Sequence, residues 1–590
     1  MPMKKTSFFL LLYIITVIEL FSATINDSQI IHPDSPVYDD FLELQTCQEI
    51  FVFTNNTPVS VSELKAYLRQ FDYETMNDYS KSLYQRIYDS LYEKENLSKI
   101  PDFVLSFHPK LNLEFYNKTN KDIPWSFNYY YKDNFITLPL NVGFGNVISF
   151  GTDIFLGKNK IVAAYPDNFF NIPVNVKDFT DEDYLEFYFP TFCYGSLANN
   201  YGDWGYSLNI GRQGKTIGQT LTGSIVYNKT FETDAYFEFD IYASAVKYSL
   251  DIVHIGSNRM DNIQGDNTDR YMYYHQIDLR PFKNFKVSLV EGSLVANSFA
   301  LRFLNPLVFM HQFGGWTNYH TPENQEIYRE TNFCADFAFM FEYIPVQNLR
   351  LYGFYNQIEM QLPWERANAW GKYYPNSIGL QMGAQYTLPL ADNSRFLFGL
   401  EWFYNSPYMY IKQTPSSSLY RVRQDMQTKE DVYSWIGSPY GPDVMGAAAS
   451  IEYNSNKKWK IGLDYVFVAK GENDFTIFDK TAGDDGNRKY YNYYPSIKYR
   501  LKKLSEEGKI DSIYDTELTY DEIYDKTKRI WITGIGEFSN QVKLSGTYSI
   551  NKSVELNGQI VYKYIVNFKH EKSFNTQGVE VAVALTYKPL

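Results

Sequence analysis

The sequence predicts an all-β protein: one large antiparallel transmembrane β-barrel of about 14 to 20 strands, about 18 being expected, with a small N-terminal helical hairpin. Three observations support this fold class: a high aromatic content, a long region with a two-residue period, and an apolar N-terminal segment. Aromatic residues make up 18% of the chain, with 53 Tyr and 44 Phe. Such residues suit β-strands and the aromatic girdles of a membrane barrel.

The two-residue period extends from about Phe103 to the C terminus, and two residues is the period of a β-strand. In the last segment, the apolar face carries Val579, Val581, Val583, Leu585 and Tyr587. The opposite face carries Glu580, Ala582, Ala584, Thr586 and Lys588. Residues 377–388, 395–404 and 459–467 alternate in the same way.

This alternation fits strands that face lipid on one side and a wet lumen on the other. A soluble sandwich would bury the apolar face against a second sheet, and alternation alone does not distinguish the two architectures. The number of segments, their length of about ten residues and the aromatic residues at their ends favour the barrel. Allowing about 25 to 35 residues for each strand and its connection, residues 103–590 hold about 14 to 20 strands.

The first 23 residues have the form of a secretory signal. Residues 1–5 are basic, and an apolar run follows over residues 7–18. Glu19 and Phe21 are unusual near a cleavage site, so an uncleaved anchor is the alternative. Beyond residue 23 no segment approaches the roughly 18 consecutive apolar residues that a helical span needs, so a membrane-embedded mature chain would have to be a barrel.

Residues 24–57 are polar, with Pro33 and Pro36 as breakers, and an irregular segment is expected there. Ser60 and Glu63 have the spacing of a capping box, which predicts a short helix. A second helix is predicted from about Asp78, because apolar residues recur every fourth position up to Leu91. The predicted domains are therefore a signal peptide (1–23), an N-terminal segment (24–100) whose helical hairpin (58–98) lies at the periplasmic side or plugs the lumen, and a barrel (101–590).

Connections of two kinds separate the strands. Short ones include residues 453–456 and 550–553, whereas long ones include residues 256–270, 311–330, 405–440 and 501–528. Short periplasmic turns and long outer loops are the asymmetry of an outer-membrane barrel.

Composition and motifs exclude several function classes. The net charge of −13 and the scattered Lys and Arg residues argue against nucleic-acid binding. Cys47, Cys193 and Cys334 lie far apart without a Cys/His cluster, so no zinc site is indicated, although one disulfide remains open. Hydrolase, metalloprotease and phosphate-loop motifs are absent, and no catalytic residue, metal or cofactor is predicted. The glycines between Gly211 and Gly218 indicate a bend or tight turn rather than a phosphate cradle.

Two loop segments, residues 314–320 and 364–370, mix Trp and Tyr with amide and charged residues. Aromatic faces with amides and carboxylates are typical of sugar-binding sites. The same residues also suit an interfacial girdle, so both interpretations stay open.

Several segments, taken in their order along the chain, resemble the capsule assembly Wzi family of outer-membrane barrels. The first is Gly211, Arg212 and Gln213, followed by the spaced Gly218 and by residues 221–224. The others are residues 274–281, 287–291, 304–306 and 406–410, and the N-terminal residues 58–60. The resemblance covers roughly residues 58–420. It implies an outer-membrane protein with a periplasmic helical part that acts as a lectin and helps to hold capsular polysaccharide at the cell surface.

Three hypotheses follow. The first is a monomeric, non-catalytic barrel in the bacterial outer membrane, in contact with its lipid, that binds a surface polysaccharide by many weak contacts through residues not identifiable from the sequence. The second is a porin-like channel or transporter whose water-filled pore is lined by Asp278, Arg280, Lys460 and Asp464. The third, a barrel enzyme, is disfavoured because His311 and His320 have no evident nucleophile nearby.

Overall fold

The computed structural model describes most of the chain, with gaps mainly in the long connections. The described residues are 25–92, 103–126, 135–156, 168–170, 192–229, 234–256, 269–296, 299–311, 333–360, 376–412, 417–424, 431–455, 458–475 and 532–589. The predicted signal peptide (1–23) and the aromatic loops 314–320 and 364–370 lie outside the described residues.

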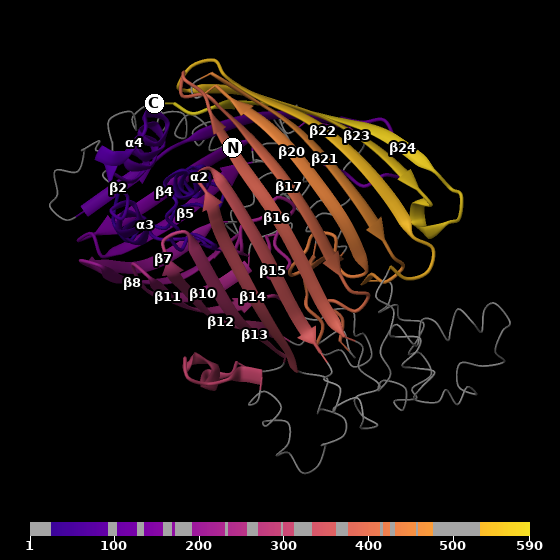
Figure 1. The fold of residues 1–590 in the computed structure, drawn as a ribbon, viewed down its shortest axis with the longest axis horizontal. Helices are drawn as coiled ribbons and strands as arrows, with labels where there is room; N and C mark the ends of the chain where they lie inside the picture. The colour runs from indigo at the N-terminus through magenta and orange to yellow at the C-terminus, as the bar shows by residue number, and fades with distance from the viewer. Residues whose placement is uncertain are drawn as a thin grey trace, which may run out of the picture.

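A closed antiparallel barrel of 18 strands forms the main body, as the sequence predicts (Figure 1). The strands are β2 Phe103–Phe107 with β3 Lys110–Lys118, β4 Ile136–Phe144, β5 Ile148–Leu156, β7 Cys193–Tyr201, β8 Trp204–Gln213, β10 Asp234–Ala243, β11 Val246–His254, β12 Arg270–Phe282, β13 Phe285–Ala296, β14 Phe333–Val346, β15 Leu349–Glu359, β16 Ser377–Pro389, β17 Arg395–Asn405, β20 Val444–Asn454, β21 Trp459–Lys470, β22 Glu537–Ser549, β23 Val554–Val566 and β24 Thr576–Tyr587. β2 and β3 pair with the same neighbour, β4, and form one strand. The short β6 Asn168–Phe170 pairs with the C-terminal half of β3. Strand β24 also pairs with β3 and so closes the barrel.

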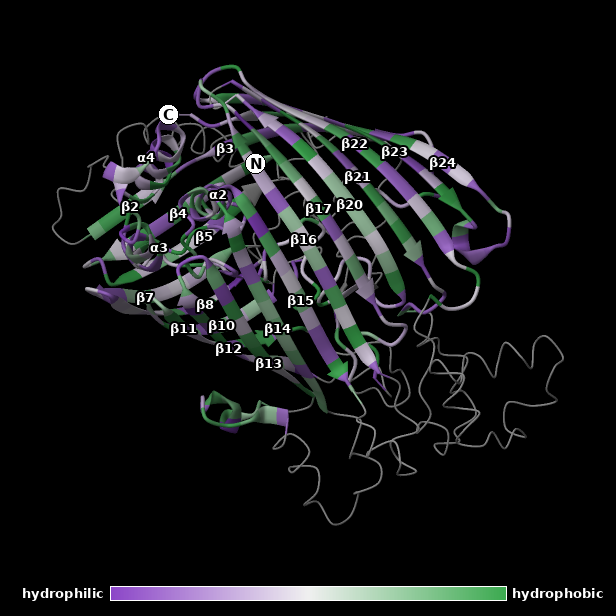
Figure 2. Cartoon of the chain, viewed as in Figure 1, coloured by the Kyte–Doolittle hydropathy of each residue, from purple (hydrophilic) through white to green (hydrophobic). Residues whose placement is uncertain are grey.

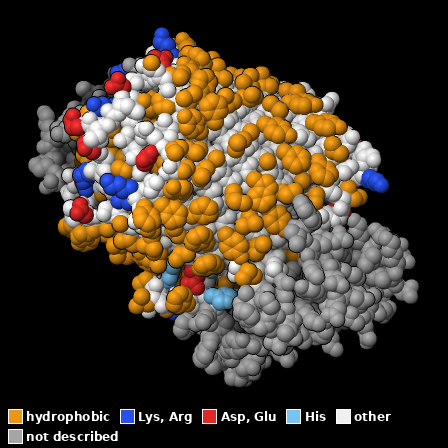
Figure 3. Space-filling view, viewed as in Figure 1, with side chains coloured by type: hydrophobic (Ala, Val, Ile, Leu, Met, Phe, Trp, Pro, Cys, Tyr) orange, Lys and Arg blue, Asp and Glu red, His pale blue; other side chains and the backbone are white. Residues whose placement is uncertain are grey.

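Alternate side chains of each strand face opposite sides of the wall. In β14, Phe337, Phe339 and Phe341 are exposed on the outer surface, whereas Asp336 and Glu342 are buried inside. The predicted apolar faces of residues 459–467 and 579–587 also point outward. Figure 2 shows the alternation along the strands, and Figure 3 shows a broad hydrophobic outer surface. An apolar exterior around a polar interior is the pattern that a bilayer requires.

The connections are short at one end of the barrel and mostly long at the other. At the short-turn end, only two to five residues separate paired strands, as between β12 and β13 (residues 283–284) and between β14 and β15 (residues 347–348). Exposed aromatic side chains gather near these turns. They are Phe144, Tyr201, Trp204, Phe282, Tyr343, Trp459, Tyr548 and Tyr587. A ring of aromatic residues marks the level at which a barrel meets the membrane–water interface.

Within the described residues 25–92, three α-helices precede the barrel and lie together at the short-turn end: α2 Val37–Gln48, α3 Val61–Leu68 and α4 Asp78–Tyr92 (Figure 1). Ser60 caps α3 by accepting a hydrogen bond from the Glu63 backbone N–H, which confirms the predicted helix start. The irregular structure predicted for residues 24–57 is wrong, because α2 occupies residues 37–48. Pro36 precedes its first turn, where a missing N–H costs nothing.

The described helices include none with the length and apolarity needed to span a bilayer.

The remaining elements are small. β1 Asn56–Thr57 pairs with β9 Thr216–Ile217, and β18 Tyr420–Gln424 pairs with β19 Asp431–Trp435. In the part of the chain that the structure describes, single turns of 3-10 helix occur at η2 Tyr73–Thr75, η5 Leu301–Leu304 and η10 Phe568–His570.

The outward orientation can be tested with two adjacent residues of β22. Val542 faces outward in the middle of the strand, whereas its neighbour Gln541 faces the lumen. We expect Val542→Arg to lower the free energy of unfolding by about 2 to 4 kcal/mol, because a cation near the bilayer midplane loses its hydration. Gln541→Arg is the matched control and should change it by less than about 1 kcal/mol. Denaturant titrations in phospholipid vesicles would measure both, and equal effects would contradict the assignment of the two faces.

Candidate functional site: an occupied lumen with one exposed polar wall

The lumen holds an internal plug. We define the plug as three parts of the chain: the N-terminal residues 25–92, the inward segment 214–229 between β8 and β10, and the described residues of 406–443 between β17 and β20. An apolar cluster joins plug residues such as Ile225, Tyr227 and Tyr410 to lumen-facing residues such as Tyr274 and Phe354. The lumen-facing side chains of β7 to β17 are therefore largely covered.

Buried ion pairs anchor the N-terminal part of the plug to β10 and β11. Lys247 Nζ lies 2.7 Å from Glu63 Oε1 of α3 and 3.3 Å from Asp240 Oδ2, and all three side chains are almost fully buried. Burial raises the pKa of Glu63 to about 7, although Lys247 acts in the opposite direction. Lys247 on β11 is thus paired with Glu63 on α3, and this ion pair positions α3 against the barrel wall.

Lys215, in the inward segment, makes a second such contact. Its ammonium group lies 2.9 Å from Glu238, 2.8 Å from Asp251 and 2.9 Å from the side-chain oxygen of Asn56. Burial lowers the pKa of Lys215, but the two carboxylates outweigh burial and the net shift is upward. The lysine thus links two parts of the plug and two strands of the wall.

At the opposite side of the helical part, Arg395 of β17 binds Glu43 of α2 at 2.6 Å and Glu452 of β20 at 2.9 Å. Tyr79 of α4 also donates a hydrogen bond to Glu43. Burial raises the pKa of Glu43, and Arg395 opposes that rise. α2 and α4 are therefore fixed to the wall as well as to each other.

The carboxylate of Glu401 holds the tip of the inward segment, at Leu221 and Thr222, by hydrogen bonds. Glu401 accepts hydrogen bonds from the backbone N–H groups of Leu221 (2.9 Å) and Thr222 (3.2 Å), and from the Thr222 hydroxyl. Tyr352 and Gln381 donate to the same carboxylate at 2.5 and 3.0 Å. Gly218, at φ +95°, supplies the tight turn that leads into this tip, in agreement with the turn predicted from the glycines.

The third part of the plug, the β18–β19 hairpin, is held by two buried arginines. Arg421 Nε lies 2.8 Å from Asp234 Oδ2 at the start of β10 and also donates to the backbone oxygen of Asn228 at 2.9 Å. Arg270 of β12 donates to the backbone oxygen of Tyr420 at 2.9 Å and stacks over its ring. The hairpin is therefore bonded to both the wall and the inward segment.

Two of the four predicted pore-lining residues serve the plug instead. Asp278 is buried and accepts hydrogen bonds from Asn55 (3.1 Å), Gln276 and Ser288. Arg280 donates to the backbone oxygen of Phe51 and to Gln70. The pore-lining role predicted for these two residues is wrong, because the N-terminal part of the plug covers them.

The other two residues, Lys460 and Asp464, belong to an exposed region of the lumen. Lys460 is 47% exposed and pairs with Glu452 at 2.8 Å, and Asp464 is 30% exposed and pairs with Lys543 at 2.7 Å. We call this region of β20 to β23 the polar wall. Its polar side chains that face the lumen and are at least partly exposed include those of Glu452, Lys460, Asp464, Gln541, Lys543, Ser545, Thr547, Asn557 and Gln559. Unlike the largely covered side chains of β7 to β17, these are partly exposed.

The reactive side chains are dispersed. The three cysteines are free thiols on α2, β7 and β14. The part of the chain that the structure describes has no group of three or more His, Cys, Asp or Glu residues that could hold a metal ion. The His311 backbone N–H donates to Glu291, and His320 lies outside the described residues.

The fold and its interior define an 18-stranded barrel of the outer-membrane type with an internal plug. In a search of solved structures, the chain is similar to Wzi from Escherichia coli, described as an outer membrane protein involved in group 1 capsule assembly and as a carbohydrate binding beta-barrel. That likeness has a TM-score of 0.52 and 11% identity, and covers 95% of this chain and 99% of the other. The outer membrane protein OprD from Pseudomonas aeruginosa gives a TM-score of 0.38 and 10% identity over 83% and 96% of the two chains. No protein-family model and no curated protein matches the sequence.

The ion pair of Lys247 offers a test of the plug. Lys247→Met leaves Glu63 and Asp240 buried without a cation, and we expect the free energy of unfolding to fall by about 3 to 5 kcal/mol at pH 8. The loss should be smaller at pH 6, because Glu63 then binds a proton and needs no counter-charge.

Lys460→Met provides the control for that measurement, because its ion pair with Glu452 is exposed to water. It should cost no more than about 1 kcal/mol at either pH. Denaturant unfolding in vesicles at both pH values would distinguish the two variants, and equal losses would contradict a buried plug held by charge.

Proposed function

We propose that this chain is a monomeric, non-catalytic protein of the bacterial outer membrane that belongs with the capsule assembly Wzi barrels and binds a surface polysaccharide. The plug is the observation that carries the proposal. A diffusion channel needs an open lumen, whereas here buried ion pairs tie helices, the inward segment and the β18–β19 hairpin to the inner surface of β7 to β17. The similarity to a carbohydrate binding beta-barrel over nearly the whole chain supports the same conclusion.

The polar wall supplies suitable chemistry for a sugar polymer. Its amide and hydroxyl side chains, among them Gln541, Gln559 and Ser545, donate to and accept from sugar hydroxyl groups. Each such bond is weak, so retention of a repeating polymer depends on many simultaneous contacts. The reaction is binding alone, and no bond of the polymer is made or broken.

Polysaccharide retention tests this proposal. The protein in detergent should bind a capsular-type polysaccharide, and the double variant Gln541→Ala/Gln559→Ala should weaken binding about tenfold, because two hydrogen bonds are lost. Biolayer interferometry on immobilised polysaccharide would measure the change.

The matched control for this experiment is Asn540→Ala/Gln577→Ala, which removes two amides from the outer face of β22 and β24. It should bind the polymer like the unaltered protein. Absence of binding to every polysaccharide tested, or equal weakening by both double variants, would contradict a lumenal sugar site.

The alternative function is a porin-like channel or transporter for small solutes, and the exposed polar wall favours it. Lys460, Lys543 and Asp464 place charges of both signs along one accessible surface, as in water-filled pores. The two functions differ in whether the plug closes the path beside this wall.

Ion conductance distinguishes the two functions. If the plug closes the lumen, the unaltered protein conducts poorly in planar bilayers, and Glu401→Ala should raise the conductance at least severalfold. The reason is that the variant removes the acceptor of five hydrogen bonds and releases the tip of the inward segment. Gln541→Ala, which leaves the plug intact, should conduct like the unaltered protein. High conductance before any substitution, unchanged in Glu401→Ala, would replace the binding function with the channel.

A further inference from the structure

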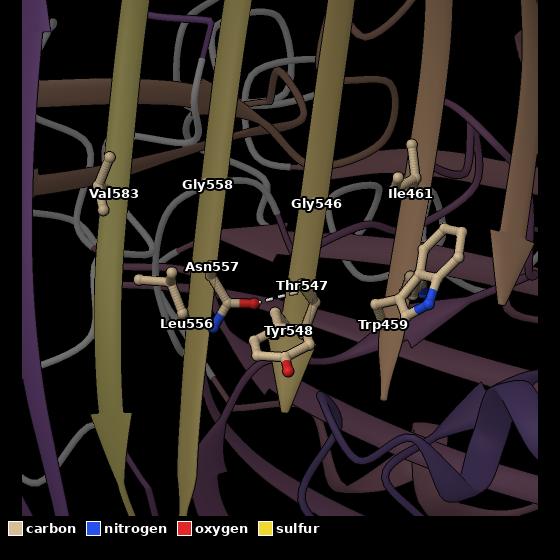
Figure 4. A pocket seen from close by; sticks show the side chains of 10 residues that line it. Trp459, Ile461, Gly546, Thr547, Tyr548, Leu556, Asn557, Gly558 and Val583 are labelled. Atoms are coloured by element: carbon tan, nitrogen blue, oxygen red, sulfur yellow. Dashed lines mark hydrogen bonds between the residues drawn. The ribbon is translucent and has the colours of Figure 1, made fainter. Parts of the chain in front are cut away.

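The outer surface of β21 to β24 carries an open groove of about 560 Å³. Gly546 of β22 and Gly558 of β23 are direct register partners and form its floor. Ile461 and Val583 flank the two glycines on the neighbouring strands, and Trp459, Tyr548 and Leu556 lie toward the short-turn end (Figure 4). We call this feature the lipid-facing groove.

The barrel itself does not need these two glycines. A Cβ atom on Gly558 would meet no atom within 4 Å, and one on Gly546 would meet only the backbone oxygen of Lys460 at 3.8 Å. By contrast, a Cβ on Gly383 would lie 2.2 Å from the ring of Tyr352, so that glycine is required by packing. Glycine weakens a strand, and where packing does not require it, it often marks the close approach of another molecule.

Positive charge is concentrated at the short-turn end of the groove. Lys458 accepts a hydrogen bond on its backbone oxygen from the N–H of Ser549, and the Lys588 backbone N–H donates to Ser553. Lys552 lies in the turn between those two serines, so the backbones of the three lysines lie close together at this end of β21 to β24, and all three side chains are exposed. The other short turns contain a single Lys and two Asp in total. These turns are residues 145–147, 202–203, 244–245, 283–284, 347–348 and 390–394.

We propose that the lipid-facing groove binds an anionic phospholipid, with an acyl chain against the backbone of Gly546 and Gly558 and the phosphate among Lys458, Lys552 and Lys588. Trp459 and Tyr548 lie between the two regions, at the level where aromatic side chains meet headgroups. Lysines near a membrane surface attract anionic headgroups. The proposal rests on the membrane location given above and assigns this part of the outer surface a specific occupant.

Native mass spectrometry of the full chain extracted from vesicles of equal parts phosphatidylglycerol and phosphatidylethanolamine tests the proposal. The unaltered protein should retain phosphatidylglycerol in preference to phosphatidylethanolamine. Gly546→Leu/Gly558→Leu fills the groove without a clash at Cβ and should reduce retention at least tenfold. Replacing the three lysines by Gln should abolish the preference, at about fivefold for each lysine.

Ala447→Leu is the control, because it places a leucine side chain at an exposed, outward-facing position of β20 beside Phe467, far from Trp459 along β21. It should retain lipid like the unaltered protein. Equal retention by the glycine variant, loss in Ala447→Leu, or a lipid-free dimer in place of the lipid complex would each overturn the lipid assignment. Failure of the unaltered protein to float with vesicles would instead overturn the membrane location itself.

Discussion

The structure depends on one electrostatic constraint: charges that the strands direct into the lumen must find partners there. Because strand side chains alternate, every outward apolar residue places its neighbour inside, and β10 alone brings Asp234, Glu238 and Asp240 inward. A carboxylate removed from water is strongly destabilising unless it is paired. The plug supplies Lys215 and Arg421 to this strand, while Lys247 of β11 is shared with Glu63. The barrel wall and its plug are thus complementary and neither is complete alone.

This complementarity also sets the limit of what the sequence reveals. The alternation that predicts the barrel is local, since residues i and i+2 share a face whatever lies opposite. For the same reason the Ser60 cap and the apolar spacing of α4 identify helices correctly. The plug, in contrast, joins residues as distant as Glu63 and Lys247 or Leu221 and Glu401. No periodicity encodes those contacts, so the sequence alone predicts that Asp278 and Arg280 line a pore.

Helix α2 and the inward segment are not predicted from the sequence, and each omission has a physical reason. α2 follows Pro36 and has little amphipathic patterning, because residues such as Glu43 and Gln45 are buried through hydrogen bonds rather than by apolar contact. The inward segment contains short turns and extended pieces in place of a regular strand, so it is indistinguishable from an outer loop in composition. The feature of the sequence that best indicates a plug is the surplus of carboxylates on the lumen face of β10. Buried carboxylates need cations, and these must come from elsewhere in the chain.

The barrel wall has two regions that differ in how far the plug covers their lumen-facing side chains. β7 to β17 have residues of the plug on their inner side, whereas the polar-wall side chains of β20 to β23 keep part of their surface exposed to the lumen. Two features fall in this part of the wall: Lys460, Thr547 and Asn557 face the lumen, while Trp459, Tyr548 and Leu556 line the lipid-facing groove. Little neighbouring packing requires a side chain at the centre of the groove, which permits opposed glycines at residues 546 and 558. The buried ion pairs therefore fix β7 to β17 to the plug, whereas the strands of the polar wall direct polar side chains inward and carry the lipid-facing groove on their outer side.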